Sequence, residues 1–121
     1  MASLSIASTH PASLVGFGSW LREQRQSRGS QRELAAVADM DSSHLGKAER
    51  GKRLPTTDQA MAIAHHLGIE EPEMLLRLFA ARFVQECGGD LELAHEAAQV
   101  VLSKTAGDLV KNSGGNVRIR K

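Results

Sequence analysis

The sequence predicts an all-α fold, and three observations support that prediction. Alanine and leucine dominate the chain of 121 residues, whereas aromatic residues make up only 3% of it. No run of β-branched residues alternates with a two-residue period, as a half-buried strand requires. Capping residues instead precede apolar residues at helical spacing several times along the chain. We therefore expect a domain of five helices followed by a C-terminal helical extension.

The first two expected helices are separated by a glycine. The first begins near residues 16–18 and ends near Arg28, with Gly29 in its C-terminal turn. The second follows Ser30, because Ser30 and Glu33 have the spacing of a capping box: the hydroxyl accepts from the third helical amide and the carboxylate reaches back to the cap. This second helix should end where Asp39 interrupts its apolar pattern.

The third and fourth helices carry equally clear end signals. Asp41 is a favourable N-cap, and Gly51 is a favourable C-terminal residue for the third helix. Thr56 and Gln59 form a second capping box, and Gly68 ends the helix that follows. The turn between the second and third helices is therefore short, and a loop with several cations joins the third helix to the fourth.

Two further helices are expected near the C-terminus. Pro72 is suited to the first turn of a fifth helix that runs to Cys87, and residues 88–89 are two glycines that break the chain. Asp90 can cap a sixth helix, whose apolar residues extend to Leu102. The fifth helix is apolar around much of its circumference, which is more than a small domain can cover by itself.

The charge is unevenly distributed, although the net charge is only +1. Residues 17–55 contain eight Lys/Arg and five Asp/Glu, a balance of +3, whereas residues 56–110 contain three and nine, a balance of −6. Residues 111–121 contain four Lys/Arg and no acidic residue. Such asymmetry is expected where one face of a domain meets phosphate, although chance clustering on a solvated surface would give a similar pattern.

Residues 17–78 resemble the Cro/repressor-type (XRE-like) helix-turn-helix family. The resemblance is carried by Leu21, Arg22, Arg25, Ser30, Gln31, Leu34, Ala35, the segment 45–55, and the leucine–glycine pair at 67–68. It implies a domain that binds double-stranded DNA and inserts its third helix into the major groove. The sequence departs from the family pattern at Asp39, where glycine is common, but aspartate tolerates the left-handed conformation better than most residues.

The resemblance also implies roles for individual residues. Ser42, Ser43 and Lys47 occupy the base-reading positions of the third helix. The residues expected to contact the DNA backbone are Gln31, His44, Arg50, Lys52 and Arg53. Arg25 and Glu49 match a pair that forms a structural salt bridge in the family, which would make Glu49 partly buried.

The excess apolar surface of the last two helices predicts an interface. Its expected residues are Leu75, Phe79, Phe83, Leu91 and Ala98. A homodimer would place two reading helices about 34 Å apart, as a palindromic DNA site requires. An intramolecular extension of the core remains an alternative. A third hypothesis is an antitoxin or adaptor, whose C-terminal helices bind a protein partner and whose DNA binding serves autoregulation.

The remaining sequence features favour a regulator over an enzyme. No nucleophile elbow or phosphate-binding loop is present, and the histidines lack metal-ligand spacing, so we expect no catalytic residue, metal or cofactor. A single cysteine, Cys87, fits a reducing cytoplasm, and neither a signal peptide nor a membrane span is evident. The expected organisation is a flexible arm (1–16), the DNA-binding domain (17–78), the extension (79–111) and a flexible basic tail (112–121).

Overall fold

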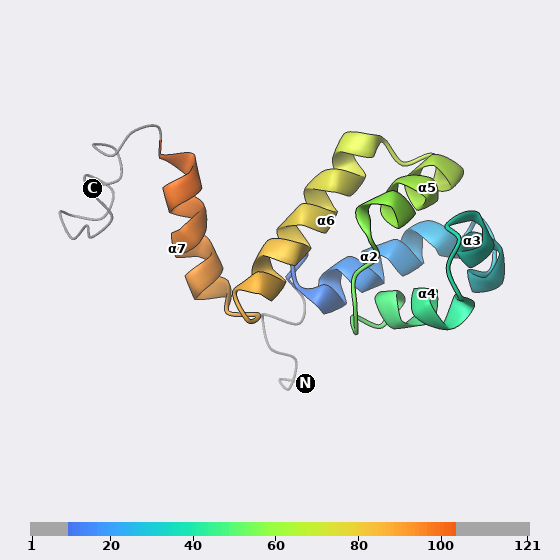
Figure 1. Ribbon diagram of the computed structural model, residues 1–121, viewed down its shortest axis with the longest axis horizontal. Coiled ribbons are helices and arrows are strands. Elements are labelled where there is room, and N and C mark those ends of the chain that lie inside the picture. Colours follow the sequence, from blue (N-terminus) through green and yellow to red (C-terminus); the bar gives the residue numbers. More distant parts are fainter. Residues whose placement is uncertain (1–9, 104–121) are drawn as a thin grey trace. The chain divides into compact units, whose positions relative to one another are not determined.

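The computed structural model describes residues 10–103 and confirms the all-α prediction (Figure 1). The described residues contain no strand. Their six helices are α2 (Leu14–Gln26), α3 (Gln31–Val37), α4 (Ser42–Glu49), α5 (Thr57–Leu67), α6 (Glu71–Glu86) and α7 (Leu91–Leu102). The basic tail expected at 112–121, most of the N-terminal arm and the end of the extension lie outside the described residues.

The chain divides into two compact units after Gly89. The boundary expected between residues 78 and 79 instead falls inside α6, a continuous helix of sixteen residues. The physical reason is that α6 buries one apolar stripe on both sides of that point, from Met74 to Val84. Gly88 and Gly89, with φ values of 71° and 81°, follow the helix and mark the actual division.

The first helix also differs from its expected bounds. It begins at Leu14, inside the segment expected to be a flexible arm, because the side chain of Ser13 caps it by accepting from the amide of Gly16. It ends at Gln26, two residues earlier than expected, with Ser27 as its C-cap.

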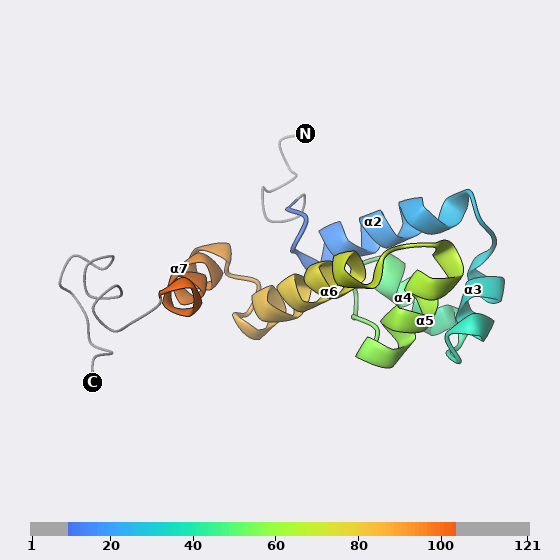
Figure 2. The ribbon, with the colours of Figure 1, turned by 90° about the horizontal axis from the view of Figure 1, so that it is seen from above.

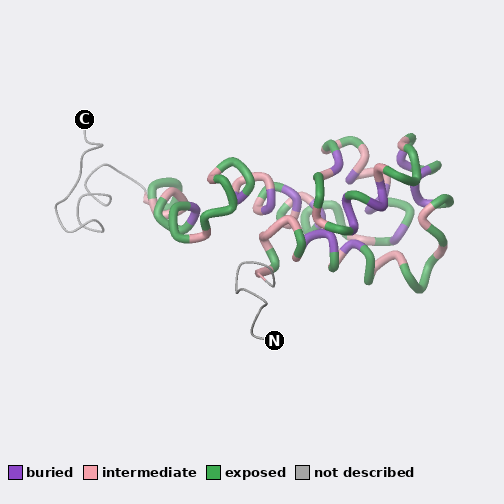
Figure 3. The backbone as a smooth tube through the Cα atoms, turned by 90° about the horizontal axis from the view of Figure 1, so that it is seen from below, coloured by how far each residue is buried: buried purple, intermediate pink, exposed green. Residues whose placement is uncertain are grey.

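Five helices, α2 to α6, enclose one hydrophobic core (Figures 1 and 2). Helix α2 contacts α4 and α6, while α5 contacts α3 and α6. In Figure 3 the buried residues follow the inner sides of these helices. The largest fully buried side chains are Phe17, Leu21, Leu34, Leu45, Ile63, Leu67, Met74 and Leu78. Every helix of this unit contributes to that set. Packing against α2 and α3 therefore fixes the position of α4.

The helix ends largely agree with the sequence signals. Both expected capping boxes form, at Ser30 with Glu33 and at Thr56 with Gln59. Gly68 ends α5 in the left-handed conformation, with φ of 74°. Asp41 occupies the N-cap position of α4, but its side chain makes no capping hydrogen bond. The carboxylate therefore contributes to the start of α4 through its charge rather than through a cap.

A close approach of two backbones sets the position of α2 on α4. A Cβ atom built on Gly18 would lie 2.4 Å from the carbonyl oxygen of Ala48 and 2.6 Å from that of Glu49. No larger residue fits at that distance. Glycine at position 18 therefore lets α2 rest directly on the C-terminal end of α4.

Helix α7 belongs to the second unit. Asp90 caps it by accepting from the amide of Leu93. Several of its apolar side chains are exposed, including Leu93 at 49% and Val101 at 77%. Within residues 10–103, no helix combines the length and the hydrophobicity that crossing a bilayer demands.

Candidate nucleic-acid interface

Helices α3 and α4 form two arms joined by a tight turn. Asp39 takes the left-handed conformation, with φ of 57°, and it is the one non-glycine residue with positive φ among those described. The amide of Met40 donates to the carbonyl of Ala35 at 2.9 Å, and the Met40 side chain packs on the core. This geometry brings α4 back against α3, which is the arrangement expected from the sequence.

Helix α4 has one buried face and one exposed face. Leu45 and Ala48 are buried in the core, whereas Ser42, Ser43 and Lys47 are all exposed. Residues one turn apart on a helix project from the same side, so Ser43 and Lys47 share a face that no part of the described chain covers. The three expected base-reading residues therefore lie together on the solvent side of α4.

A buried ionic network supports α4 on the side that faces the domain. Arg25 on α2 donates to both carboxylate oxygens of Glu49, from Nε to Oε2 at 2.5 Å and from Nη2 to Oε1 at 2.9 Å. The amide Nε2 of Gln31, in the first turn of α3, donates to Oε1 of Glu49 at 2.9 Å. Arg25 also donates to the carbonyl of Gly29 at 3.1 Å. The expected pair of Arg25 and Glu49 is thus present, and together with Gln31 it joins α2, α3 and α4.

Burial makes this network an internal feature of the domain. The side chain of Glu49 is 2% exposed and that of Arg25 is 12% exposed. The hydrogen bond to Glu49 raises the pKa of Arg25 above its ordinary value, against the opposing effect of burial. Arg25 supplies the cation that a buried carboxylate requires.

The loop that follows α4 presents cations to solvent. We call residues 50–56 the basic loop; Arg50, Lys52 and Arg53 are all exposed on it. Its first part is fixed to α4, because the amide of Lys52 donates to the carbonyl of Lys47 at 2.8 Å. The remaining candidates for backbone contact, Gln31 and His44, are half-buried.

Gly46 leaves room between Gln31 and Arg50. It is buried, and a Cβ atom at that position would lie 3.1 Å from Nη1 of Arg50 and 3.6 Å from Oε1 of Gln31. The guanidinium of Arg50 therefore lies back over α4, close to the Gln31 amide. This arrangement brings two of the expected backbone-contacting groups to one place.

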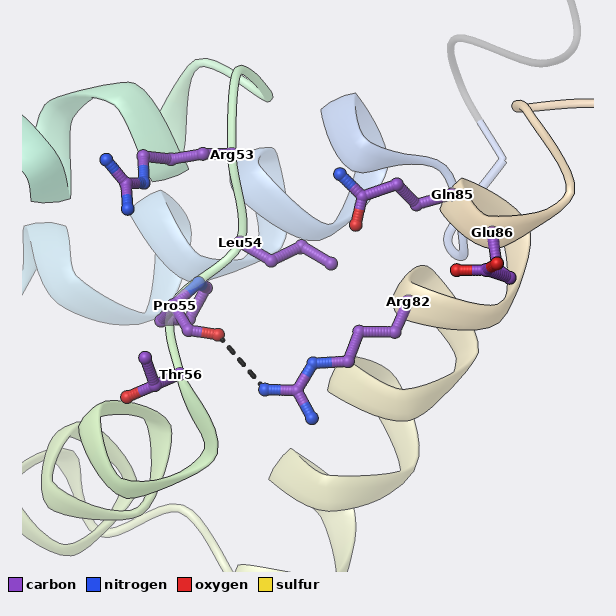
Figure 4. Close-up of a pocket in the computed structure, with 7 residues that line it drawn as sticks. All are labelled: Arg53, Leu54, Pro55, Thr56, Arg82, Gln85 and Glu86. Carbon is purple, nitrogen blue, oxygen red and sulfur yellow. Dashed lines mark hydrogen bonds between the residues drawn. The ribbon is translucent and has the colours of Figure 1, made fainter.

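Two arginines that the sequence did not single out hold the domain together. Arg82 on α6 donates to the hydroxyl of Thr57 at 2.9 Å. It also donates to the carbonyl of Pro55 at 3.3 Å (Figure 4). Arg28 donates to the carbonyl of Leu67, the last residue of α5. The partners lie 25 to 39 residues away in sequence, so no local pattern could have identified them.

The residues expected at an interface fall on both units and differ in exposure. On α6, Phe79 is 48% exposed, whereas Leu75 and Phe83 are half-buried. Leu76, which was not among the expected interface residues, is 71% exposed. On α7, Leu91 and Ala98 are half-buried.

The described residues offer no obvious metal site. Within residues 10–103, no three His, Cys, Asp or Glu side chains are grouped closely enough to hold a metal ion. Cys87 is half-buried and is present as a free thiol.

A comparison with known protein families matches this region. Residues 21–74 match the family model described as helix-turn-helix, a segment that extends from α2 into α6. The comparisons with curated proteins and with solved structures gave no match.

Proposed function

Residues 21–74 belong to the Cro/C1-type helix-turn-helix family, whose members are DNA-binding regulators, and we propose that this chain is a dimeric repressor that reads a palindromic site. The observation that carries the proposal is the exposed face of α4, where Ser42, Ser43 and Lys47 lie together above a buried network. This face has the shape and the chemistry to enter the major groove of B-DNA.

The proposed base contacts follow from the donors on α4. The ammonium of Lys47 donates to the O6 and N7 acceptors of guanine, and the hydroxyls of Ser42 and Ser43 can pair with either base type. His44, beside them, is assigned to the DNA backbone. Arg25 and Glu49 fix the angle of α4 on α2, so the three donors enter the groove in a defined orientation.

The proposed phosphate contacts lie on either side of this face. Arg50, Lys52 and Arg53 bind the backbone of one strand, and Gln31 approaches it from the start of α3. These contacts provide affinity and register without sequence information. They also explain why the positive charge is concentrated in residues 17–55 while the rest of the domain is acidic.

The proposed dimer interface uses apolar side chains of α6 and α7 that are exposed or half-buried. Its residues are Leu75, Phe79, Phe83, Leu91 and Ala98, with Leu76 now added because of its exposure. Two copies related by a twofold axis would present two α4 helices to successive major grooves. Binding over a promoter would then exclude polymerase. Because its proposed ligand is DNA, the protein would act in the cytoplasm, where the chromosome lies.

Selection of bound fragments from random duplex DNA tests the proposal. We expect recovery of palindromic half-sites with centres 10–10.5 base pairs apart, or a multiple of that distance. Lys47→Ala should relax the preference at one base position in each half-site, with a penalty of about 1–3 kcal/mol on the selected site. Arg53→Ala is the matched comparison: it should weaken all duplexes alike and reduce the salt dependence of binding. No preference for any duplex at low ionic strength would refute the proposal.

The oligomeric state separates two versions of this function. Analytical ultracentrifugation should give a dimer at tens of micromolar protein. A monomer at that concentration would remove the dimer from the proposal. The apolar faces of α6 and α7 would then favour the antitoxin or adaptor hypothesis, in which a different protein covers them.

A further inference from the structure

We propose that Arg82 is a positioning residue of the DNA interface. From α6 it holds the basic loop in the position in which Lys52 and Arg53 can bind phosphate. The inference rests on the proposed function, because it assigns a purpose to contacts that lie outside the helix-turn-helix. Arg82 itself would not touch DNA.

Hydrogen bonds hold the basic loop at its two ends. At its start, the amides of Gly51 and Lys52 donate to carbonyls of α4, at 3.1 Å and 2.8 Å. At its end, the amide of Thr56 donates to the side chain of Gln59 at 3.0 Å. In the part of the chain that the structure describes, the amides of Arg53 and Leu54 donate to no other group. The orientation of Arg53 therefore depends on the packing of Leu54 and Pro55 and on the hydrogen bonds that hold the residues just after it.

Arg82 provides that support. Its Nη2 donates to the carbonyl of Pro55 at 3.3 Å, and its Nη1 donates to the hydroxyl of Thr57 at 2.9 Å. Figure 4 shows the side chain reaching from α6 to the loop. A guanidinium has its donors in a rigid planar fork, so these two bonds fix both the distance and the angle between α6 and the loop.

A cavity of about 480 Å³ lies between the loop and the last turns of α6. It is lined by Arg53, Leu54, Pro55, Thr56, Arg82, Gln85 and Glu86. Leu54 packs against the core and Pro55 is buried, and these contacts hold the loop to the domain. The two bonds from Arg82 add its polar connection to α6. The base of Arg82 is rigid in turn, since Leu78 and Ala81 on the same helix are fully buried.

Two measurements on the full chain test this role, one without DNA and one with it. In Arg82→Met, exchange of the Thr56 and Gln59 amides with solvent should become roughly tenfold faster, because the capping box loses its support. The salt dependence of binding to a fixed duplex should fall by about 0.9 in the log–log slope for each phosphate that the loop no longer neutralises. Arg82→Lys, which keeps the charge and one donor group, should restore part of both effects.

Arg77→Met is the matched control on the same helix. Arg77 bonds Glu73 and stacks over Trp20, with its guanidinium carbon 4.4 Å from the ring centroid. No interaction with the basic loop is found for it among the described residues, so its loss should leave both measurements unchanged. Thr57→Val removes only one acceptor of Arg82, and it should give a smaller change than Arg82→Met. This variant keeps the test available if Arg82→Met does not fold.

The outcomes separate this inference from the proposed function. Unchanged amide exchange and an unchanged salt slope in Arg82→Met, with normal binding by the wild-type chain, would overturn the role of Arg82. Equal effects of Arg77→Met and Arg82→Met would also overturn it, because the change would then reflect general stability. If the wild-type chain binds no duplex, the proposed function fails, and the DNA-interface role of Arg82 fails with it, whatever the exchange experiment shows about the loop.

Discussion

Removal of Arg25 should be the most damaging single change to the folded state outside the apolar core. In Arg25→Met, the Glu49 carboxylate keeps the hydrogen bond from Gln31 but loses two others. Its side chain is 2% exposed, so water can replace few of the missing donors. Breaking a buried ion pair by removing one partner costs about 3–5 kcal/mol. Because Arg25 is 12% exposed, we expect the lower end, about 3 kcal/mol.

The loss should disappear largely when the carboxylate is removed as well. Replacing a buried ion pair with apolar residues of similar volume is often neutral, because the desolvation of both charges is avoided. The double variant Arg25→Met/Glu49→Leu should therefore be more stable than Arg25→Met alone. Glu49→Leu alone leaves Arg25 unpaired but partly exposed to water. This variant should therefore lose less stability than Arg25→Met.

Urea unfolding followed by the fluorescence of Trp20 measures these differences. Trp20 is the single tryptophan, and its ring lies 5.9 Å from that of Phe17 in the core of the first unit. The m-value should stay constant, so that a shift of the midpoint reports stability. A loss of 3 kcal/mol corresponds to a fall of about 12–24 °C in Tm for a domain of this size. If Arg25→Met lost less than about 1 kcal/mol, or if the double variant were no more stable than Arg25→Met, the reasoning about a buried unpaired carboxylate would be wrong.

The other stability predictions concern backbone geometry, and the same unfolding measurement checks them. Gly18→Ala would place a Cβ 2.4 Å from the carbonyl oxygen of Ala48, so α2 must move, and we expect a loss of about 1–3 kcal/mol. Ser19→Ala, at the exposed neighbouring position, should change stability by less than about 0.5 kcal/mol, and equal effects would contradict the close approach. Asp39→Gly should stabilise the turn by about 0.5–1 kcal/mol, because glycine adopts positive φ freely, whereas Asp39→Val should destabilise it by about 1–2 kcal/mol. Equal stability of these two variants would contradict strain at that position.

Most helix ends could be predicted from the sequence because their signals are local. The capping boxes at Ser30 and Thr56 connect groups three residues apart, and Gly68 ends α5 through its own φ. The exposed positions of Ser42 and Lys47 likewise follow from helical period once the buried face of α4 is known. The resemblance to a family, rather than spacing, supplied the pair of Arg25 and Glu49.

The end of the first unit could not be predicted from the same signals. Residues on both sides of position 78 are apolar, and nothing local distinguishes side chains that enter the core from those that stay exposed. Met74 is fully buried, whereas Leu76, two residues later, is 71% exposed. That difference depends on which face of α6 meets α2 and α5, which is a property of the assembled helices.

The sequence by itself thus determined that the chain forms capped helices, and which of them carries exposed donors above a basic loop. Those features depend on hydrogen bonds and periodicities that reach no further than about one helical turn. Only the tertiary structure decided that Gly18 lies against the carbonyls of α4 and that Arg82 reaches Pro55, 27 residues away. Core packing brings the groups in these contacts together. Their distance along the chain does not predict their distance in space.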